Sequence, residues 1–164
     1  MRFDRVITLG MGRALASLGL GGGSSRSGRV LSVLMYHSLS DDVEPVADYY
    51  KVCTSPDRFR AQMGWMKSQG FVGVDLASGL KWLRGENAAA CGIPEGKTPV
   101  AVTFDDGFQD FHVHGLPALA EHGFRATMYV PTSFVGDGDR RSFLNRGCMT
   151  WSELKECLSA GIEL

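Results

Sequence analysis

The chain has 164 residues, enough for one domain with a hydrophobic core, and 44% of them are apolar, as in an ordinary soluble globular protein. Its formal net charge of −1 gives no indication of nucleic-acid binding, and no apolar run of about 18 residues predicts a transmembrane helix. The four cysteines form no C-x-x-C pair, which argues against a zinc ribbon and favours free buried thiols in a reducing compartment.

Residues 1–29 form a basic arm, with five arginines against one aspartate, so that 12 basic and 17 acidic residues remain for the rest of the chain. Within residues 1–20, apolar side chains recur at helical spacing. They predict either an ordinary frayed helix or an amphipathic helix that contacts a membrane surface. Arg13 interrupts the apolar centre that a secretory signal needs, so a cytoplasmic location is favoured. The Gly/Ser-rich residues 21–28 predict a linker, and we place the domain at residues 30–164.

The domain opens with an apolar run at residues 30–36, which predicts a strand buried on both faces. Ser55 and Pro56 predict the N-cap and the first residue of a helix that ends at Gly70. Short apolar runs and helical spacing then predict strands at 71–74, 99–102 and 126–130, and helices at 77–84 and 116–122.

The last predicted helix begins at Thr150, which forms a capping box with Glu153, and we expect it to bury Trp151, Leu154 and Leu158. Residues 162–164 begin another strand. Strands that alternate with helices predict a parallel sheet with helical crossovers, as a barrel or as an open sheet. A final strand of three residues with no element to cover it suggests an incomplete domain.

Two acids and a glycine, Asp105, Asp106 and Gly107, follow the most apolar of these strands. Buried carboxylates are costly unless they are paired or bind a metal, and α/β folds build their sites at the carboxyl ends of parallel strands. Asp and Gly also favour ordinary turns. From spacing alone, a site and a plain turn therefore both stay open.

His37 also follows a predicted strand, but a hydrogen-bonded histidine without a functional role is the favoured interpretation. His112 and His114 are two residues apart, and on a helix they would face away from each other. His122 stands at a helix end, where the helix dipole favours a cation. These four histidines do not predict a metal site.

The string VTFDDGF at 102–108, followed by LPAL at 116–119 and GFRATMYV at 123–130, resembles the polysaccharide deacetylases. These are the NodB-homology proteins, also grouped as carbohydrate esterase family 4. LMYHS at 34–38 resembles the opening strand of many members, and MTW at 149–151 resembles the segment before the next family motif.

The resemblance implies an α/β fold of the distorted (β/α) barrel type, here incomplete, and a divalent metal, usually zinc. It implies removal of acetyl groups from N- or O-acetylated oligo- or polysaccharides, as in chitooligosaccharide deacetylases. It also implies that Asp105 is the general base and that Asp106 is a metal ligand. A carboxylate in reach of metal-activated water can take its proton as the water attacks the acetyl carbonyl.

In the family, two metal-binding histidines in a His-x-x-x-His motif follow the strand that begins here at Ile162. We therefore expect a domain truncated before this motif, which is metal-poor and inactive alone because catalytic zinc uses three protein ligands. One alternative is a carbohydrate-binding pseudoenzyme without catalysis. Another, magnesium-dependent phosphoryl transfer, is disfavoured because the sequence has no glycine string that would cradle a phosphate.

Overall fold

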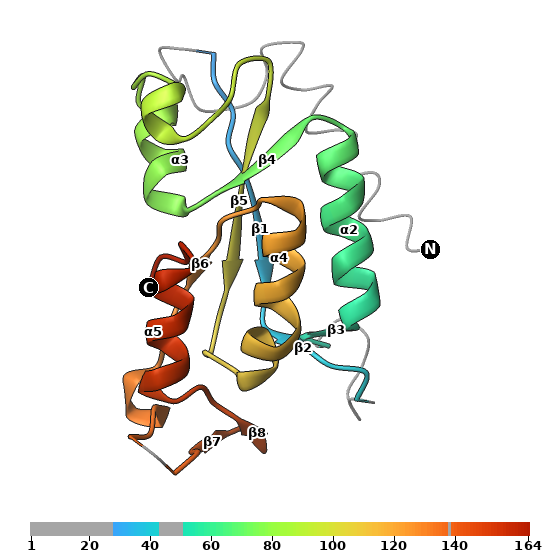
Figure 1. The fold of residues 1–164 in the computed structure, drawn as a ribbon, viewed down its shortest axis with the longest axis vertical. Coiled ribbons are helices and arrows are strands. Elements are labelled where there is room, and N and C mark those ends of the chain that lie inside the picture. The colour runs from blue at the N-terminus through green and yellow to red at the C-terminus, as the bar shows by residue number, and fades with distance from the viewer. Residues whose placement is uncertain (1–27, 43–50, 138) are drawn as a thin grey trace.

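The computed structural model describes residues 28–42, 51–137 and 139–164. The helix expected within residues 1–20 lies outside the described residues, as does the expected linker up to residue 27. Figure 1 shows strands at the centre, with helices packed beside them and the carboxyl ends of β1 and β5 pointing to the lower end of the view.

The sheet is built around β5 (Thr98–Phe104). It pairs in parallel with β1 (Ser32–Tyr36) along one edge, and with β4 (Phe71–Val74) and then β6 (Thr127–Met128) along the other. The predicted parallel pairing is confirmed. In the part of the chain that the structure describes, the strands form an open sheet and no closed barrel.

Burial differs sharply between the central strand and its neighbour β1. All residues of β5 after Thr98 are buried, and each of its core valines contributes about 1.5–3 kcal/mol on burial. In β1, Val33 and Met35 are 52% and 64% exposed, so the prediction of a strand buried on both faces is wrong. The exposed Val33 and Met35 alternate with Leu34 and Tyr36, which pack against the core, because successive side chains of a strand point to opposite faces and only one face of β1 meets the core.

The α-helices of the described residues lie beside the strands: α2 (Pro56–Ser68), α3 (Leu76–Leu83), α4 (Leu116–His122), which continues from a π-helical turn at Phe111–Gly115, and α5 (Trp151–Ser159). The predicted start of α2 is confirmed, because the Ser55 hydroxyl accepts a hydrogen bond from the Arg58 N–H at 3.3 Å. Its buried face consists of Phe59, Met63 and Met66, as the spacing predicts. The predicted stop of α4 at Gly123 is also confirmed, since this glycine has a φ of 71°.

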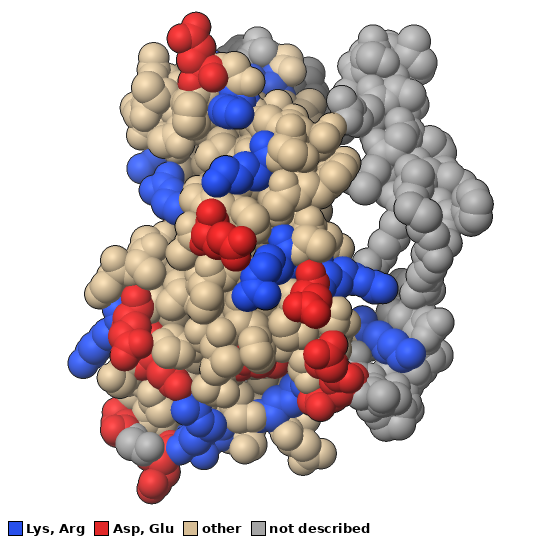
Figure 2. Space-filling view, turned by 45° about the vertical axis from the view of Figure 1, so that its right-hand side comes forward, with Lys and Arg blue, Asp and Glu red and all other residues tan. Residues whose placement is uncertain are grey.

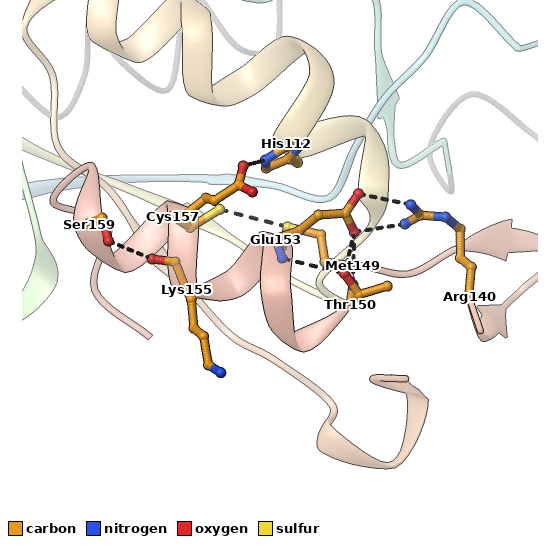
Figure 3. Close-up of polar contacts among 9 residues, drawn as sticks. His112, Arg140, Met149, Thr150, Glu153, Lys155, Cys157 and Ser159 are labelled. Carbon is orange, nitrogen blue, oxygen red and sulfur yellow. Dashed lines mark hydrogen bonds and ion pairs between the residues drawn. The ribbon is translucent and has the colours of Figure 1, made fainter. Parts of the chain in front are cut away.

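The capping box at the start of α5 is present and is reinforced by an arginine (Figure 3). The Thr150 N–H donates to Glu153 Oε2 at 2.8 Å, and the Arg140 guanidinium donates to both oxygens of the same carboxylate, at 2.9 and 2.8 Å. The predicted inner face is wrong in part, because Trp151 and Leu158 are 40% and 53% exposed. Leu154 and Cys157 are buried instead.

The remaining segments are short. The final predicted strand is a single bridge between Glu163 and Thr127. The predicted loop at 136–147 contains a hairpin of β7 (Ser142–Phe143) and β8 (Arg146–Gly147), and β2 (Ser38–Leu39) pairs in parallel with β3 (Cys53–Thr54).

Three of the four cysteines are free buried thiols, as expected. Cys91, Cys148 and Cys157 are buried and Cys53 is half-buried. Burial raises the pKa of Cys157 to about 11, which makes it an inert part of the core.

The surface carries mixed charge. On the face shown in Figure 2, basic and acidic side chains are interspersed over the described surface. No helix among the described residues is long and apolar enough to cross a membrane.

Candidate active site

The two acids follow directly from the most deeply buried strand. The ladder between β1 and β5 continues one residue past the strand, because the Asp105 N–H donates to the Tyr36 carbonyl at 3.0 Å. On the other side, the Tyr129 N–H donates to the Phe104 carbonyl at 2.8 Å. The backbone that carries Asp105 is thus fixed from both neighbouring strands.

The chain then turns through two residues in the left-handed region. Asp106 has a φ of 69° and Gly107 has a φ of 58°. Glycine adopts this conformation freely, and aspartate tolerates it better than most residues do. The turn is held from the far side, because the Met149 N–H donates to the Gly107 carbonyl at 2.8 Å and Phe108 pairs with Cys148.

His37 lies beside the first acid. Its Nε2 is 3.6 Å from Asp105 Oδ2, and the two side chains are 23% and 29% exposed. The sequence interpretation favoured a histidine without a functional role and did not connect the two residues. The signal was present, however, because each residue directly follows one of two paired strands, with Tyr36 in register with Phe104.

The second acid is in an environment that disfavours its charge. Burial raises the pKa of Asp106, and the neighbouring Asp105 carboxylate adds to this effect, whereas the nearby His37 opposes it. A carboxylate with this environment is stabilised by any cation that reaches it.

The other histidines lie outside this arrangement. His112 Nε2 is 2.8 Å from the Glu156 carboxylate on α5 (Figure 3). His122 is 4.0 Å from Glu121, and its ring packs on Gly64 of α2. His114 lines a surface pocket beyond Asp110.

The described residues supply only part of a metal site. Carboxylate oxygens are suitable ligands for a divalent cation, and Asp106 offers them in a partly desolvated position. Among the described residues there is no group of three or more His, Cys, Asp and Glu side chains that could hold a metal ion. These residues do not by themselves build the three-ligand centre of a catalytic zinc site.

Comparison with known proteins shows which family this strand and its acids resemble. Residues 92–164, which include Asp105 and Asp106, match the family model for polysaccharide deacetylases.

The similarity to individual deacetylases extends further along the chain. YxkH of Bacillus subtilis, named as a candidate polysaccharide deacetylase, is 24% identical over 138 residues, which cover 82% of this chain and 40% of that protein. The Streptococcus pyogenes deacetylase PplD in complex with acetate has a TM-score of 0.62 and 25% identity, over 81% of this chain and 54% of that one. IcaB from Ammonifex degensii has a TM-score of 0.58 and 25% identity, over 82% of this chain and 50% of that one.

The resemblance found in the sequence is therefore confirmed, and the chain is similar to carbohydrate deacetylases over most of its length. The related structures have the (β/α) barrel fold, of which the described residues show a mixed α/β part with an open sheet. The chain spans about half the length of the solved deacetylase structures and 40% of the curated relative.

Proposed function

We propose that this protein removes acetyl groups from N-acetylated, or O-acetylated, oligo- or polysaccharides by metal-dependent hydrolysis, in the manner of a chitooligosaccharide deacetylase. The observation that carries the proposal is the meeting of Asp105, Asp106 and His37 at the carboxyl ends of two paired strands. This is where α/β folds gather catalytic side chains.

Asp105 is the proposed general base. Its backbone is fixed by the bond to Tyr36, and its carboxylate is partly exposed, so that a water molecule can reach it. The carboxylate takes a proton from this water as the oxygen attacks the acetyl carbonyl. General base catalysis by a positioned group contributes about 10²–10⁴-fold to a rate.

His37 is the proposed acid that protonates the leaving amine. Its Nε2 lies 3.6 Å from Asp105 Oδ2, so the ring is beside the proposed base, and histidine is the side chain that most often transfers protons in catalysis. The pair thus combines a group that accepts a proton with one that donates a proton on the same side of the sheet.

Asp106 is the proposed metal ligand, with zinc as the expected metal. When bound, such a cation polarises the acetyl carbonyl and makes water more acidic. Asp106 would be a single ligand, so the proposal includes the expectation that the 164-residue chain is inactive on its own.

Acetate release from N-acetylglucosamine oligomers tests the proposal. In a chimera, residues 28–164 replace the matching segment of the Streptococcus pyogenes deacetylase, and zinc is added. We expect acetate release, which Asp105→Asn lowers by at least about 10²-fold without lowering the melting temperature. Asp57→Asn is the matched control, because the Asp57 side chain is 99% exposed on α2.

A folded chimera that releases no acetate, while the parent enzyme does, would contradict the proposed catalytic role. If the 164-residue chain binds the oligomers equally well with and without metal, a non-catalytic carbohydrate-binding protein becomes the better description. Acetate release by the 164-residue chain itself would overturn the expected inactivity.

A further inference from the structure

Three neighbouring strands of the sheet end at the same level beside the acids. Tyr36 of β1 and Met128 of β6 are each in register with Phe104 of β5, one on either side of it. The residues that follow them in β1, β5 and β6 are His37, Asp105 and Tyr129. We call these three residues the strand-end row. Its first two members are the proposed acid and base, and Tyr129 has no part in the proposed reaction.

The strand-end row lies on the face of the sheet that is turned away from the main core. Phe104 and Met128 are buried in that core, and the residue in register with them on β1 packs against it. Successive side chains of a strand point to opposite faces, so the side chains of the row point the other way. The exposure of Tyr129, at 50%, agrees with this direction. Its ring is therefore on the same face as the proposed base.

The backbone of Tyr129 is held against the turn that carries the acids. Its N–H donates to the Phe104 carbonyl at 2.8 Å. A Cβ on Gly107 would lie 3.7 Å from both Val130 Cγ1 and Pro131 Cδ, so the segment that follows the row packs on the acid turn. The same strand end and turn thus fix the positions of this tyrosine and of the proposed base.

The Tyr129 side chain contributes little to the described fold. Half of the residue is exposed, and its hydroxyl makes no hydrogen bond with the described residues. Tyrosine combines a large apolar ring with a polar end, and for this reason it is enriched at surfaces that bind a partner. An exposed aromatic ring at the level of a proposed base is therefore well placed to contact a ligand.

We propose that Tyr129 is a substrate-binding residue, whose ring packs against the sugar unit that presents its acetyl group to Asp105. The proposal rests on the proposed function, which supplies the substrate class. A pyranose ring has a face of C–H groups with hydroxyls around its edge, and this face is the part of a sugar that an aromatic ring can cover. The contact is the same before and during the reaction, so it lowers KM and leaves kcat unchanged.

Binding to the 164-residue chain tests this contact without metal or turnover. The probes are tetramers of N-acetylglucosamine with β-1,4 or β-1,6 linkages, and the affinity is measured by NMR titration. For the linkage that binds, Tyr129→Ala should weaken the affinity by at least about fivefold, because the ring is lost. Tyr129→Phe keeps the ring and should stay within about twofold of the wild type.

Trp65→Ala is the matched control, because it removes an aromatic side chain that is 61% exposed on α2, a helix that packs on the opposite face of the sheet. It should leave the affinity unchanged. Chemical labelling of the wild-type chain gives a second measurement that needs no variant. N-acetylimidazole acetylates accessible tyrosine hydroxyls, and mass spectrometry identifies the modified residue. A saturating concentration of the bound tetramer should slow the labelling of Tyr129.

Kinetics separate this role from a merely structural one. In the chimera, Tyr129→Ala should raise KM for acetate release by at least about fivefold and change kcat by less than about twofold. A residue that only supported the fold would lower the melting temperature without this selective rise in KM, and that result would contradict the proposal.

The proposal is also overturned if neither tetramer binds to the wild-type chain, if Tyr129→Ala binds as tightly as the wild type, or if the tetramer leaves the labelling of Tyr129 unchanged. Failure of the chimera to release acetate, with binding that still depends on Tyr129, would instead count against the proposed function. The two results are distinguishable, because the binding and labelling experiments require neither metal nor turnover.

Discussion

Two features of Asp106 each cost the folded state free energy. Its backbone is in the left-handed region, which costs most non-glycine residues about 1–2 kcal/mol, and its carboxylate is partly desolvated. Neither cost benefits the fold, because an asparagine in this position would keep the turn without the charge. Costs of this kind are concentrated at functional sites, which is the residue-level argument for a cation-binding role.

Asp106→Asn should therefore stabilise the protein at pH 7. The pKa of Asp106 is raised in the folded state. Its protonated carboxyl therefore stabilises the fold at pH below the unfolded pKa of 3.8, and this stabilisation is lost as pH rises through the folded pKa. The gain in the midpoint of thermal unfolding should disappear as pH falls towards 3.8. Asp106→Ala should be about 1 kcal/mol less stable than Asp106→Asn, because alanine tolerates the left-handed backbone poorly. Equal stability of wild type and Asp106→Asn at pH 7 would contradict this argument.

At the scale of elements, the start of α5 depends on an ion pair with Glu153. Hydrogen bonds from Arg140 lower the pKa of Glu153 to about 2, against the opposing effect of burial. Because the pKa of Glu153 is lowered in the folded state, its ionised carboxylate stabilises the fold at pH above the unfolded pKa of 4.5. This stabilisation is lost as pH falls towards 2.

Glu153→Gln should cost about 2 kcal/mol at pH 7, after allowance for solvent screening of the half-exposed Arg140. Denaturant unfolding at pH 7 and at lower pH measures the difference, which should shrink as pH falls below 4.5. Glu156→Gln is the control on the same helix. It removes a carboxylate that is 62% exposed and should cost no more than about 0.5 kcal/mol. A cost for Glu153→Gln that is independent of pH would exclude the ion pair as its cause.

Two glycines in neighbouring elements should respond in opposite ways to substitution by alanine. A Cβ on Gly73 of β4 would lie 2.6 Å from the Phe124 side chain, so Gly73→Ala should destabilise the protein by about 1–3 kcal/mol. A Cβ on Gly64 of α2 would be 3.4 Å from His122, an ordinary contact. Gly64→Ala should therefore stabilise the protein by up to about 1 kcal/mol. Thermal unfolding of the two variants checks the pair, and a stabilising Gly73→Ala would show that β4 can move away from Phe124.

The sequence was most informative where the determinants of an element are local. The Ser55–Pro56 start of α2 and the capping box of α5 depend on residues within one turn, and both are confirmed. The inner face of α5 depends on which neighbours it meets, so Trp151 and Leu158 were assigned to the core while the structure buries Cys157. A small thiol packs as well as a methyl group, but hydrophobic spacing alone gives it little weight.

The candidate site was predicted only in part, because some of its determinants are local and others are contacts between distant parts of the chain. The two acids could be read from a single strand end, whereas the contact of His37 with Asp105 joins residues that are far apart in the sequence. The pairing of β1 with β5 brings them together, and strand order was not predicted. Which acid holds a metal stays a prediction.

At the scale of the whole molecule, the described residues carry the proposed catalytic acids at one end of an open sheet. The related structures are about twice as long as the part that this chain matches. The metal site depends most on this difference in length, because its ligands must come from several elements. The described residues contain no group of three or more His, Cys, Asp and Glu side chains that could hold a metal ion.

Zinc titration of the 164-residue chain tests this argument directly. With one carboxylate as the proposed ligand, we expect a stoichiometry well below one zinc per chain at micromolar concentrations, measured by calorimetry or by elemental analysis after dialysis. Asp106→Asn should abolish the residual binding, whereas Glu86→Gln, which removes an exposed acid remote from the site, should leave it unchanged. A stoichiometry near one that is lost in Asp106→Asn would show that this chain completes the centre itself, and the expected inactivity would then be withdrawn. Binding near one that Asp106→Asn does not affect would remove Asp106 from the metal site.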